Sequence, residues 1–206
     1  MEKVLLIGMG GHAKSMIDCI EAQGKYQIAG YTDLRDKGVY RKYHYLGTDN
    51  ELQEIYDRGG RKAVVALFGG GGQKGLREKL YDKLKNIGYQ LPIIQDPSSL
   101  VAKDAVVGEG VCIAKNTVIN ASSKIGKMCI INTGAIVEHE DEVGEFSHIA
   151  VGAVLCGGVK VGKGCFIGAN ATVLPGVEVG DYCTVGAGST VLRNVKEGFT
   201  VYGIVR

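Results

Sequence analysis

The second half of the chain repeats with a period of six residues, and this period limits the possible folds more than any other feature. From Ser99 onward the chain divides into hexads without one insertion, and the third residue of the first sixteen hexads is aliphatic. These residues are Val101, Val107, Ile113, Ile119, Ile125, Ile131, Val137, Val143, Ile149, Leu155, Val161, Ile167, Val173, Val179, Val185 and Val191. A single hexad cannot bury its own apolar face, so hexads must stack on their neighbours. Glu197 ends the run, and residues 98–206 are predicted to form a parallel β-helix.

The other places of the hexad fit the same geometry. The first place is mostly small and the fourth is often glycine, which suits a chain that turns at each corner of a triangular coil. Three hexads make a coil of about 18 residues, so residue i lies about 4.8 Å from residue i+18. Cys165 and Cys183 stack in this way, and Cys129 lies two coils below Cys165. The six cysteines include no C-x-x-C pair, so we interpret them as packed free thiols and not as metal ligands or disulfides.

The first half alternates apolar strands with amphipathic helices, which predicts a parallel sheet in a Rossmann-like α/β domain. Strands are expected at 3–8, 26–32, 62–68 and 91–95, and helices at 12–23, 50–58 and 74–87. The segment Asp96-Pro97-Ser98-Ser99 breaks this alternation. The chain is therefore expected to have two domains, an α/β domain at 1–97 and an all-β domain at 98–206.

Composition argues against several classes of partner. The chain carries 24 basic and 22 acidic residues, and a net charge of +2 gives no global field for nucleic acid or a membrane surface. No apolar stretch is long enough to span a bilayer. The apolar run at 3–8 is short and has no charged leader, so it predicts a strand and not a signal peptide. The cytoplasm is the expected compartment.

Five short segments carry a resemblance to a known family. They are GMGGH at 8–12, NT at 132–133, VEHE at 137–140, GEFSH at 144–148 and GAN at 168–170. In this order and spacing they resemble the NeuD-like and PglD-like sugar O- and N-acetyltransferases of the sialic acid and bacillosamine pathways. The resemblance implies a left-handed β-helix of the hexapeptide-repeat acyltransferases. It also implies a homotrimer with active sites between adjacent subunits.

His139 is the first candidate for catalysis. It stands at the fifth place of its hexad, away from the inward third place, and three carboxylates adjoin it, those of Glu138, Glu140 and Asp141. A carboxylate held against an imidazole fixes its tautomer and makes it a better base. The resemblance implies that His139 is the general base and that Glu140 tunes it, whereas the alternative is a solvated acidic corner. Asp141 departs from the family, in which this place normally takes a small, uncharged residue.

The expected acetyl-CoA site involves residues of later hexads. Gly157 and Gly158 lie one coil on from His139 and can approach it closely because they lack a Cβ, and a backbone N–H there would hold an oxyanion. The resemblance places Gly157, Ala169 and Ala187 along the acetyl-CoA arm; the alternative is that they are ordinary corner residues. It also implies that His148 contacts the thioester end, either in its own chain or from the neighbouring subunit; the alternative is a packed inter-subunit histidine.

The glycine turn at 8–12 follows a buried strand and opens a helix, whose N-terminus can accept a phosphate. Asp33, at the end of the second strand, stands where a carboxylate usually binds a ribose hydroxyl. The resemblance implies a nucleotide-sugar site that uses Gly10, Gly11, His12 and Asp33, the loop from Gly69 to Gly72, and Asn132 near the sugar. A dehydrogenase is disfavoured, since fewer than about 100 residues precede the β-helix, too few for a full dinucleotide-binding fold.

These residues together predict an acetyl-CoA-dependent N-acetyltransferase that acts on a nucleotide-linked amino sugar and needs no metal. A sialic acid O-acetyltransferase is one alternative, and a trimeric scaffold with a nucleotide-sugar sensor domain is another. A β-helical carbonic anhydrase needs three histidine zinc ligands, but the second half contains only His139 and His148.

Overall fold

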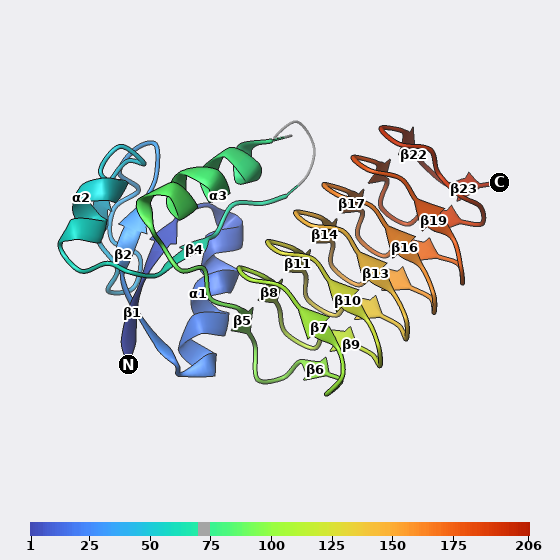
Figure 1. Cartoon of the computed structure of the whole chain (residues 1–206), viewed down its shortest axis with the longest axis horizontal. Helices are drawn as coiled ribbons and strands as arrows, with labels where there is room; N and C mark the ends of the chain where they lie inside the picture. Colours follow the sequence, from blue (N-terminus) through green and yellow to red (C-terminus); the bar gives the residue numbers. More distant parts are fainter. Residues whose placement is uncertain (70–74) are drawn as a thin grey trace.

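Four parallel strands form the sheet of the N-terminal domain, in the order β3-β2-β1-β4. The computed structural model describes residues 1–69 and 75–206. The strands are β1 (Glu2–Ile7), β2 (Tyr26–Thr32), β3 (Tyr45–Gly47) and β4 (Ala63–Val65), and the helices are α1 (Gly11–Gln23), α2 (Leu52–Asp57) and α3 (Leu76–Ile87). Figure 1 shows this domain at one end of an elongated molecule.

The apolar run of β1 is buried on both faces, as expected for a central parallel strand. Alternate residues of β1 point to opposite sides, so Val4 and Leu6 pack in one cluster with the apolar side of α1. Leu5 and Ile7 pack in another cluster with residues of α2 and α3. The domain is therefore a three-layer α/β structure, with α1 on one face of the sheet and α2 and α3 on the other.

The β-helix consists of three parallel sheets, which we name after their first strands. The β5 sheet contains β5 (Ile94–Gln95), β8 (Cys112–Ile113), β11 (Ile130–Ile131), β14 (His148–Ile149), β17 (Phe166–Ile167), β20 (Thr184–Val185) and β22 (Thr200–Val201). The β6 sheet contains β6 (Leu100–Val101), β9 (Val118–Ile119), β12 (Ile136–Val137), β15 (Val154–Leu155), β18 (Thr172–Val173), β21 (Thr190–Val191) and β23 (Ile204–Val205). The β7 sheet contains β7 (Val106–Val107), β10 (Lys124–Ile125), β13 (Glu142–Val143), β16 (Lys160–Val161) and β19 (Glu178–Val179).

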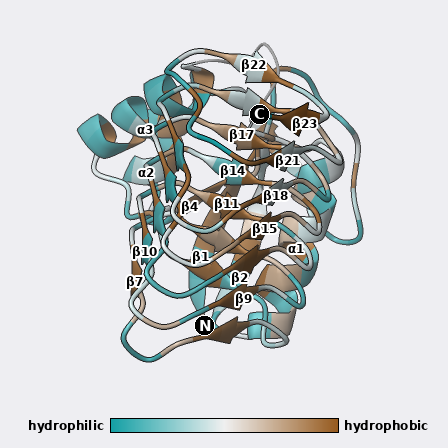
Figure 2. Cartoon of the chain, turned by 90° about the vertical axis from the view of Figure 1, so that its right-hand side faces the viewer, coloured by the Kyte–Doolittle hydropathy of each residue, from teal (hydrophilic) through white to brown (hydrophobic). Residues whose placement is uncertain are grey.

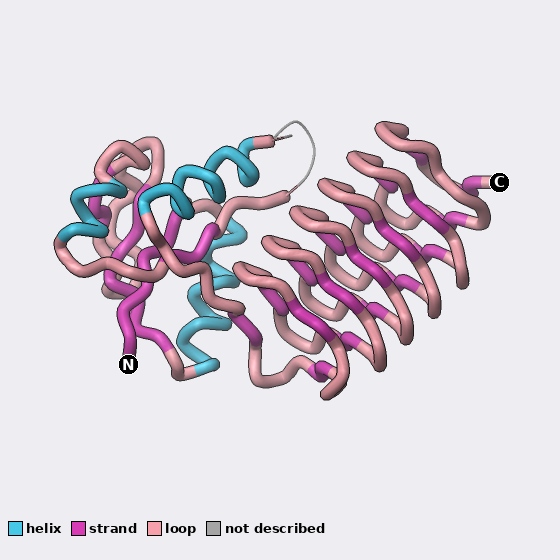
Figure 3. The backbone as a smooth tube through the Cα atoms, in the orientation of Figure 1, coloured by secondary structure: helices cyan, strands magenta, loops and turns pink. Residues whose placement is uncertain are grey.

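The chain passes through the three sheets in turn, so each coil has three corners. The first corner joins the β5 sheet to the β6 sheet, the second joins the β6 sheet to the β7 sheet, and the third returns to the β5 sheet. Figure 3 shows how short the strands are compared with the turns between them. The inward third-place residues and the small first-place residues form one continuous buried cluster along the axis. The expected fold class, an α/β domain followed by a left-handed parallel β-helix, is confirmed.

Two details of the strand assignment differ from the sequence prediction. The segment 91–95 was expected as a fourth strand of the N-terminal sheet, and this expectation is wrong, because β5 pairs with β8 of the β-helix. The β-helix thus begins before Asp96, ahead of the break that suggested a boundary. Conversely, the edge strand β3 of the N-terminal sheet has no counterpart in the sequence prediction.

The hexad period fails at the end of the β-helix, as the change at Glu197 predicted. Thr184 pairs with Thr200, and Thr190 pairs with Ile204, so the last coil is shorter than the others. Figure 2, which views the molecule from the side of the C-terminus, shows hydrophobic strands stacked behind this last coil and hydrophilic outer surfaces on α2 and α3.

Buried polar contacts attach the N-terminal domain to the β-helix. Arg77 of α3 donates hydrogen bonds to the main-chain oxygens of Phe146, at 3.1 Å, and of Met128. Both acceptors lie at third corners. His148 of β14 is bonded to the carbonyl of Gly69. The two domains therefore share a packed junction along the third corner and the β5 sheet. No helix within 1–69 or 75–206 has both the length and the apolar character needed to cross a bilayer.

Candidate active site

His139 projects from the second corner of its coil, between β12 and β13. Its side chain is 61% exposed, so it plays no part in the core. Glu140 follows in the left-handed backbone region, with φ of 61°, and this conformation makes the sharp turn that exposes both residues. The corner thus presents the imidazole to solvent on a rigid coil.

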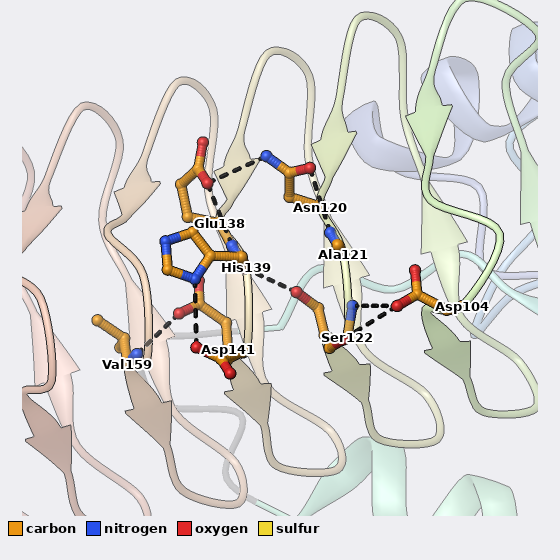
Figure 4. A network of polar contacts seen from close by, with 10 residues as sticks. Asp104, Asn120, Ala121, Ser122, Glu138, His139, Asp141 and Val159 are labelled. Atoms are coloured by element: carbon orange, nitrogen blue, oxygen red, sulfur yellow. Dashed lines mark hydrogen bonds and ion pairs between the residues drawn. The ribbon is translucent and has the colours of Figure 1, made fainter.

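Two carboxylates hold the His139 segment. Glu140 Oε2 lies 3.4 Å from His139 Nδ1, and Glu138 Oε2 accepts the backbone N–H of His139 at 3.1 Å. Glu138 is itself fixed, because the same oxygen accepts a hydrogen bond from Asn120 of the preceding coil at 3.0 Å (Figure 4). With Nδ1 directed at a carboxylate, the Nε2 atom of His139 is the one left to exchange a proton.

Gly157 lies directly beside this Nε2 atom. A Cβ placed on Gly157 would be 2.5 Å from both Nε2 and Cε1 of His139, so only glycine leaves room for the ring. The next residue, Gly158, donates its N–H to the His139 carbonyl at 2.9 Å. Among the described residues, the N–H of Gly157 itself has no hydrogen-bond acceptor. An imidazole and a backbone N–H without a described acceptor therefore lie side by side, and such a pair can act as base and oxyanion donor.

Asp141 is fully buried under this corner. Its Oδ1 accepts the Val159 N–H at 2.7 Å, as Figure 4 shows, whereas Oδ2 is buried without a hydrogen-bond partner among the described residues. Burial raises the pKa of Asp141 to about 7, and the nearby Glu138 carboxylate adds to this rise. Asp141 is thus not part of a solvated acidic corner.

A second polar group lies at the domain junction. His148 is completely buried, with Nδ1 2.6 Å from the Gly69 oxygen and Nε2 3.2 Å from the side-chain nitrogen of Asn132. The carbonyl needs a donor and the amide nitrogen is one, so Nδ1 carries the proton and Nε2 accepts. Burial lowers the pKa of His148 to about 3, which keeps this imidazole neutral. Phe68 and Phe166 pack edge-on against its ring.

His12 lies next to this group, with its ring centroid 6.4 Å from that of His148. Burial, together with the nearby charge of Arg77, lowers the pKa of His12 to about 4. Its Nε2 is buried and has no protein partner among the described residues. Gly69, His12 and Asn132 are thus brought together from three distant parts of the sequence.

The glycine turn and Asp33 also meet. The N–H of Met9 donates to Asp33 Oδ2 at 2.9 Å, which holds the carboxylate against the turn that precedes α1. Among residues 1–69 and 75–206, no side chain caps the N-terminus of α1, and no atom beyond the chain neighbours lies within 4 Å of the Cβ positions of Gly10 and Gly11. The first N–H groups of the helix are therefore open to an anion. Gly72 lies in 70–74, outside the described residues.

Two families match this chain. Residues 3–84 match the PglD N-terminal domain, and residues 142–174 and 158–193 match the bacterial transferase hexapeptide family (six repeats).

Solved structures match the chain almost from end to end. PerB from Caulobacter crescentus, in complex with CoA and GDP-perosamine, is 35% identical with a TM-score of 0.92, over 98% of this chain and 95% of that one. A histidine-to-alanine variant of GDP-perosamine N-acetyltransferase from Caulobacter crescentus, also with CoA and GDP-perosamine, is 34% identical with a TM-score of 0.93, over 98% and 94%. The acetyltransferase domain of PglB from Neisseria gonorrhoeae FA1090, in complex with acetyl coenzyme A, is 29% identical with a TM-score of 0.91, over 98% and 96%. The chain belongs to the PglD-type hexapeptide-repeat sugar N-acetyltransferases.

As a member of this family, the protein is an acyltransferase, and the scaffold alternative falls away. The residues expected for acetyl-CoA do not lie in one place on this acetyltransferase. Gly157 is at a second corner beside His139, whereas Ala169 and Ala187 follow β17 and β20 at first corners. Asn132, expected near the sugar, is also at a first corner. The second and first corners of one coil are separated by a side of the triangle, at most about 20 Å for six extended residues.

The role of His148 in acetyl-CoA binding stays a prediction. In this chain its two ring nitrogens already have protein partners, and none of them is His139 or Glu140. Sequence reasoning missed two features that this acetyltransferase builds around its histidines, the Arg77 anchor and the Phe68 contact, because both come from the other domain. Within the residues that the structure describes, no three His, Cys, Asp or Glu side chains form a group that could hold a metal ion.

Proposed function

We propose that this acetyltransferase moves the acetyl group of acetyl-CoA to the amino group of a nucleotide-linked amino sugar. Relatives with CoA, acetyl coenzyme A and GDP-perosamine bound support the two substrate classes. The observation that carries the proposal is the contact of His139 Nε2 with Gly157, whose N–H has no acceptor among the described residues. This pair supplies a base and an oxyanion donor at one point on the surface.

The proposed reaction is a direct transfer. The sugar amine attacks the thioester carbonyl, and His139 Nε2 accepts the proton that the amine loses. Glu140, 3.4 Å from Nδ1, stabilises the imidazolium that forms. The Gly157 N–H donates to the developing oxyanion. The tetrahedral intermediate then collapses to an amide as its bond to sulfur breaks. The CoA sulfur takes the proton from His139 and leaves as a thiol.

The acceptor is proposed to bind on the N-terminal domain. Asp33 would accept a ribose hydroxyl, and the uncapped N-terminus of α1 would bind phosphate next to Gly10 and Gly11. His12 Nε2 is buried and without a protein partner among the described residues, and the His12 ring lies 6.4 Å from that of His148, which contacts Asn132. This arrangement would leave the amino sugar near the β-helix.

A homotrimer would complete this site. The N-terminal domain contacts the third corner and the β5 sheet, whereas His139 lies at the second corner, opposite that sheet in the triangular coil. The sugar bound on one chain would therefore meet His139 of a neighbouring chain. The outer side of the β6 sheet supports such contact, since Leu100 and Ile204 are 68% and 63% exposed. A stable monomer in sedimentation at micromolar concentration would contradict this arrangement.

The test is release of CoA, followed with a thiol reagent. UDP-, GDP- and CMP-linked amino sugars are compared with free sialic acid, each with acetyl-CoA. We expect release with at least one nucleotide-linked amino sugar and none with sialic acid. Release with sialic acid alone would replace the proposal by O-acetylation, and release with none, although calorimetry shows that both ligands bind, would overturn it.

A further inference from the structure

The buried carboxyl of Asp141 has no role in the mechanism above. It stands at the first place of its hexad, in a column of fully buried or small residues at successive second corners. The column continues with Val159, Val177 and Val195 in the coils that follow. An acidic side chain among such residues costs stability unless its polar atoms are satisfied.

Polar residues at first places elsewhere in the β-helix follow a fixed hydrogen-bond pattern. Ser147 accepts the N–H of Cys165, 18 residues on, at 2.9 Å and donates to the carbonyl of Gly162, 15 residues on, at 2.7 Å. Ser123 likewise donates to the carbonyl of Glu138, 15 residues on, at 2.6 Å. A polar first-place side chain can therefore accept an N–H 18 residues on and donate to a carbonyl 15 residues on, as Ser147 does.

Asp141 meets the first half of this pattern. Its Oδ1 accepts the N–H of Val159, 18 residues on, at 2.7 Å. By the pattern of Ser147, the carbonyl that a hydrogen on Oδ2 would reach is that of Cys156, 15 residues on. A carboxylate has no hydrogen to donate there, and Oδ2 is buried without a partner among the described residues. A neutral carboxylic acid would satisfy both halves, as the Ser147 hydroxyl does.

We propose that Asp141 is a positioning residue, which as a neutral acid donates from Oδ2 to the Cys156 carbonyl and so aims the Gly157 N–H at the oxyanion. The inference rests on the proposed function. Cys156 C=O and Gly157 N–H belong to one planar trans peptide and point in opposite directions, so a bond inside the coil fixes the donor outside it. Hydrogen bonds in such a chain also polarise one another, by about 10–30% each.

The ionisation of Asp141 then has a definite consequence. The titratable groups that face it are Glu138 and His139 of its own coil and Cys156 of the next. The segment 121–123 of the preceding coil is uncharged. Burial raises the pKa of Asp141 to about 7. Above this pH the carboxyl group loses its proton, and the resulting carboxylate repels the Cys156 oxygen. We therefore expect kcat to fall as pH rises.

Two substitutions separate positioning from packing. Asp141→Asn offers an oxygen to Val159 and an N–H to Cys156 but cannot ionise, so it should keep kcat within about threefold below pH 7 and lack the fall above it. Asp141→Val matches the other residues of the column and loses both bonds, so below pH 7 its kcat should be about tenfold to a hundredfold lower than that of the wild type. The KM for acetyl-CoA should change less than about twofold, because the donor acts on the transition state.

A control removes a similar bond far from His139. Cys165 donates to the carbonyl of Gly180, 15 residues on, at 3.0 Å, and Cys165→Val should leave kcat unchanged. The inference is overturned if Asp141→Val keeps the wild-type kcat, or if Asp141→Asn keeps the fall in kcat above pH 7.

An infrared difference spectrum between wild type and Asp141→Asn at pH 6, without substrates, adds a readout that needs no activity. A protonated carboxyl band is expected, and its absence overturns the inference. Wild-type protein that shows this band but releases no CoA with any acceptor would instead count against the proposed function.

Discussion

The two histidines of the β-helix illustrate how the same side chain is used in opposite ways nine residues apart. His139, at the second corner, is exposed, and its Nε2 lies beside a glycine with an unused N–H. His148, at the junction, is buried with both ring nitrogens bonded and its pKa lowered to about 3. The exposed ring of His139 is accessible to solvent, whereas both ring nitrogens of His148 are occupied by Gly69 and Asn132.

The comparison shows that the place of a residue in its hexad does not by itself decide how exposed the side chain is. Its exposure also depends on which part of the chain covers that face of the β-helix. His148 points outward from the β5 sheet, as a second-place residue should, yet Phe68 and Gly69 of the N-terminal domain cover it. His139 points outward at a corner that no described part of its own chain covers. Substitutions at the two positions should therefore change different properties of the protein.

Replacing His139 should have the largest effect on catalysis. In His139→Ala, kcat should fall by about two to four orders of magnitude, since the proposed general base is lost. Both substrate affinities should stay within a few fold, and the thermal midpoint should hardly move because the side chain is 61% exposed.

Wild type and variant are to be compared with the same amino-sugar substrate. If His139→Ala kept more than about a tenth of the wild-type kcat, His139 would not be the base. Unassisted attack by a neutral amine would then be the leading explanation.

Replacing Gly157 should have the next largest effect. An alanine Cβ would lie 2.5 Å from His139 Nε2 and Cε1, so the imidazole must move away from the Gly157 N–H. Such a displacement costs about a hundredfold in kcat. Gly157 is not among the residues with positive φ, so alanine fits the backbone and the thermal midpoint should be preserved. A Gly157→Ala variant with the wild-type kcat would show that Gly157 does not belong to the active site.

Much of the second corner could be predicted from the sequence, because the hexad register is rigid. A coil of three hexads puts Gly157 beside His139, and the contact between them confirms that step. The register also predicted that the cysteines at first places are buried, and Cys129, Cys165 and Cys183 lie in the core.

The junction could not be predicted in the same way. β5 has two residues, and an apolar run that short fits a strand of either domain, so only its pairing with β8 decides where it belongs. The burial of His148 depends on Phe68 and Gly69, which are separated from it in sequence by the whole first part of the β-helix. No periodic pattern links residues in two different folds.

Replacing His148 should lower the free energy of unfolding and should not slow the chemical step. In His148→Phe, the Gly69 carbonyl and the Asn132 amide lose their partner, at a cost of about 2–3 kcal/mol in the free energy of unfolding at pH 7. The matched variant His139→Ala should lose almost nothing in the same urea titration. A His148→Phe protein as stable as wild type would contradict the structural role assigned to this histidine.

The effect of His148 should also depend on pH. Because its folded pKa is about 3 and an unfolded histidine titrates near 6.5, the unfolded state binds the extra proton between these values. Wild-type stability from this group is therefore fully present above pH 6.5 and is lost as pH falls, by roughly 2 kcal/mol at pH 5. The difference between wild type and His148→Phe should shrink accordingly, although His12, with a pKa of about 4, destabilises both proteins in acid.

Replacing Asp33 should have the smallest effect, and it tests whether the acceptor belongs to the junction side of the molecule. Asp33→Ala removes a carboxylate that is held against the glycine turn by the Met9 N–H at 2.9 Å. One charged hydrogen bond to a ribose hydroxyl is lost, so the nucleotide-sugar Kd should rise about tenfold to a hundredfold. Acetyl-CoA affinity should not change, because the acetyl-CoA site is proposed at the corners of the β-helix. Asp33→Asn keeps an oxygen for the Met9 N–H and serves as the control for the turn, so its loss should be smaller. Calorimetric titration of each variant with both ligands measures the two affinities separately. Equal losses of both affinities would mean that Asp33 supports the fold as a whole. The assignment of nucleotide-sugar binding to the junction side, separate from the second corner, would then be wrong.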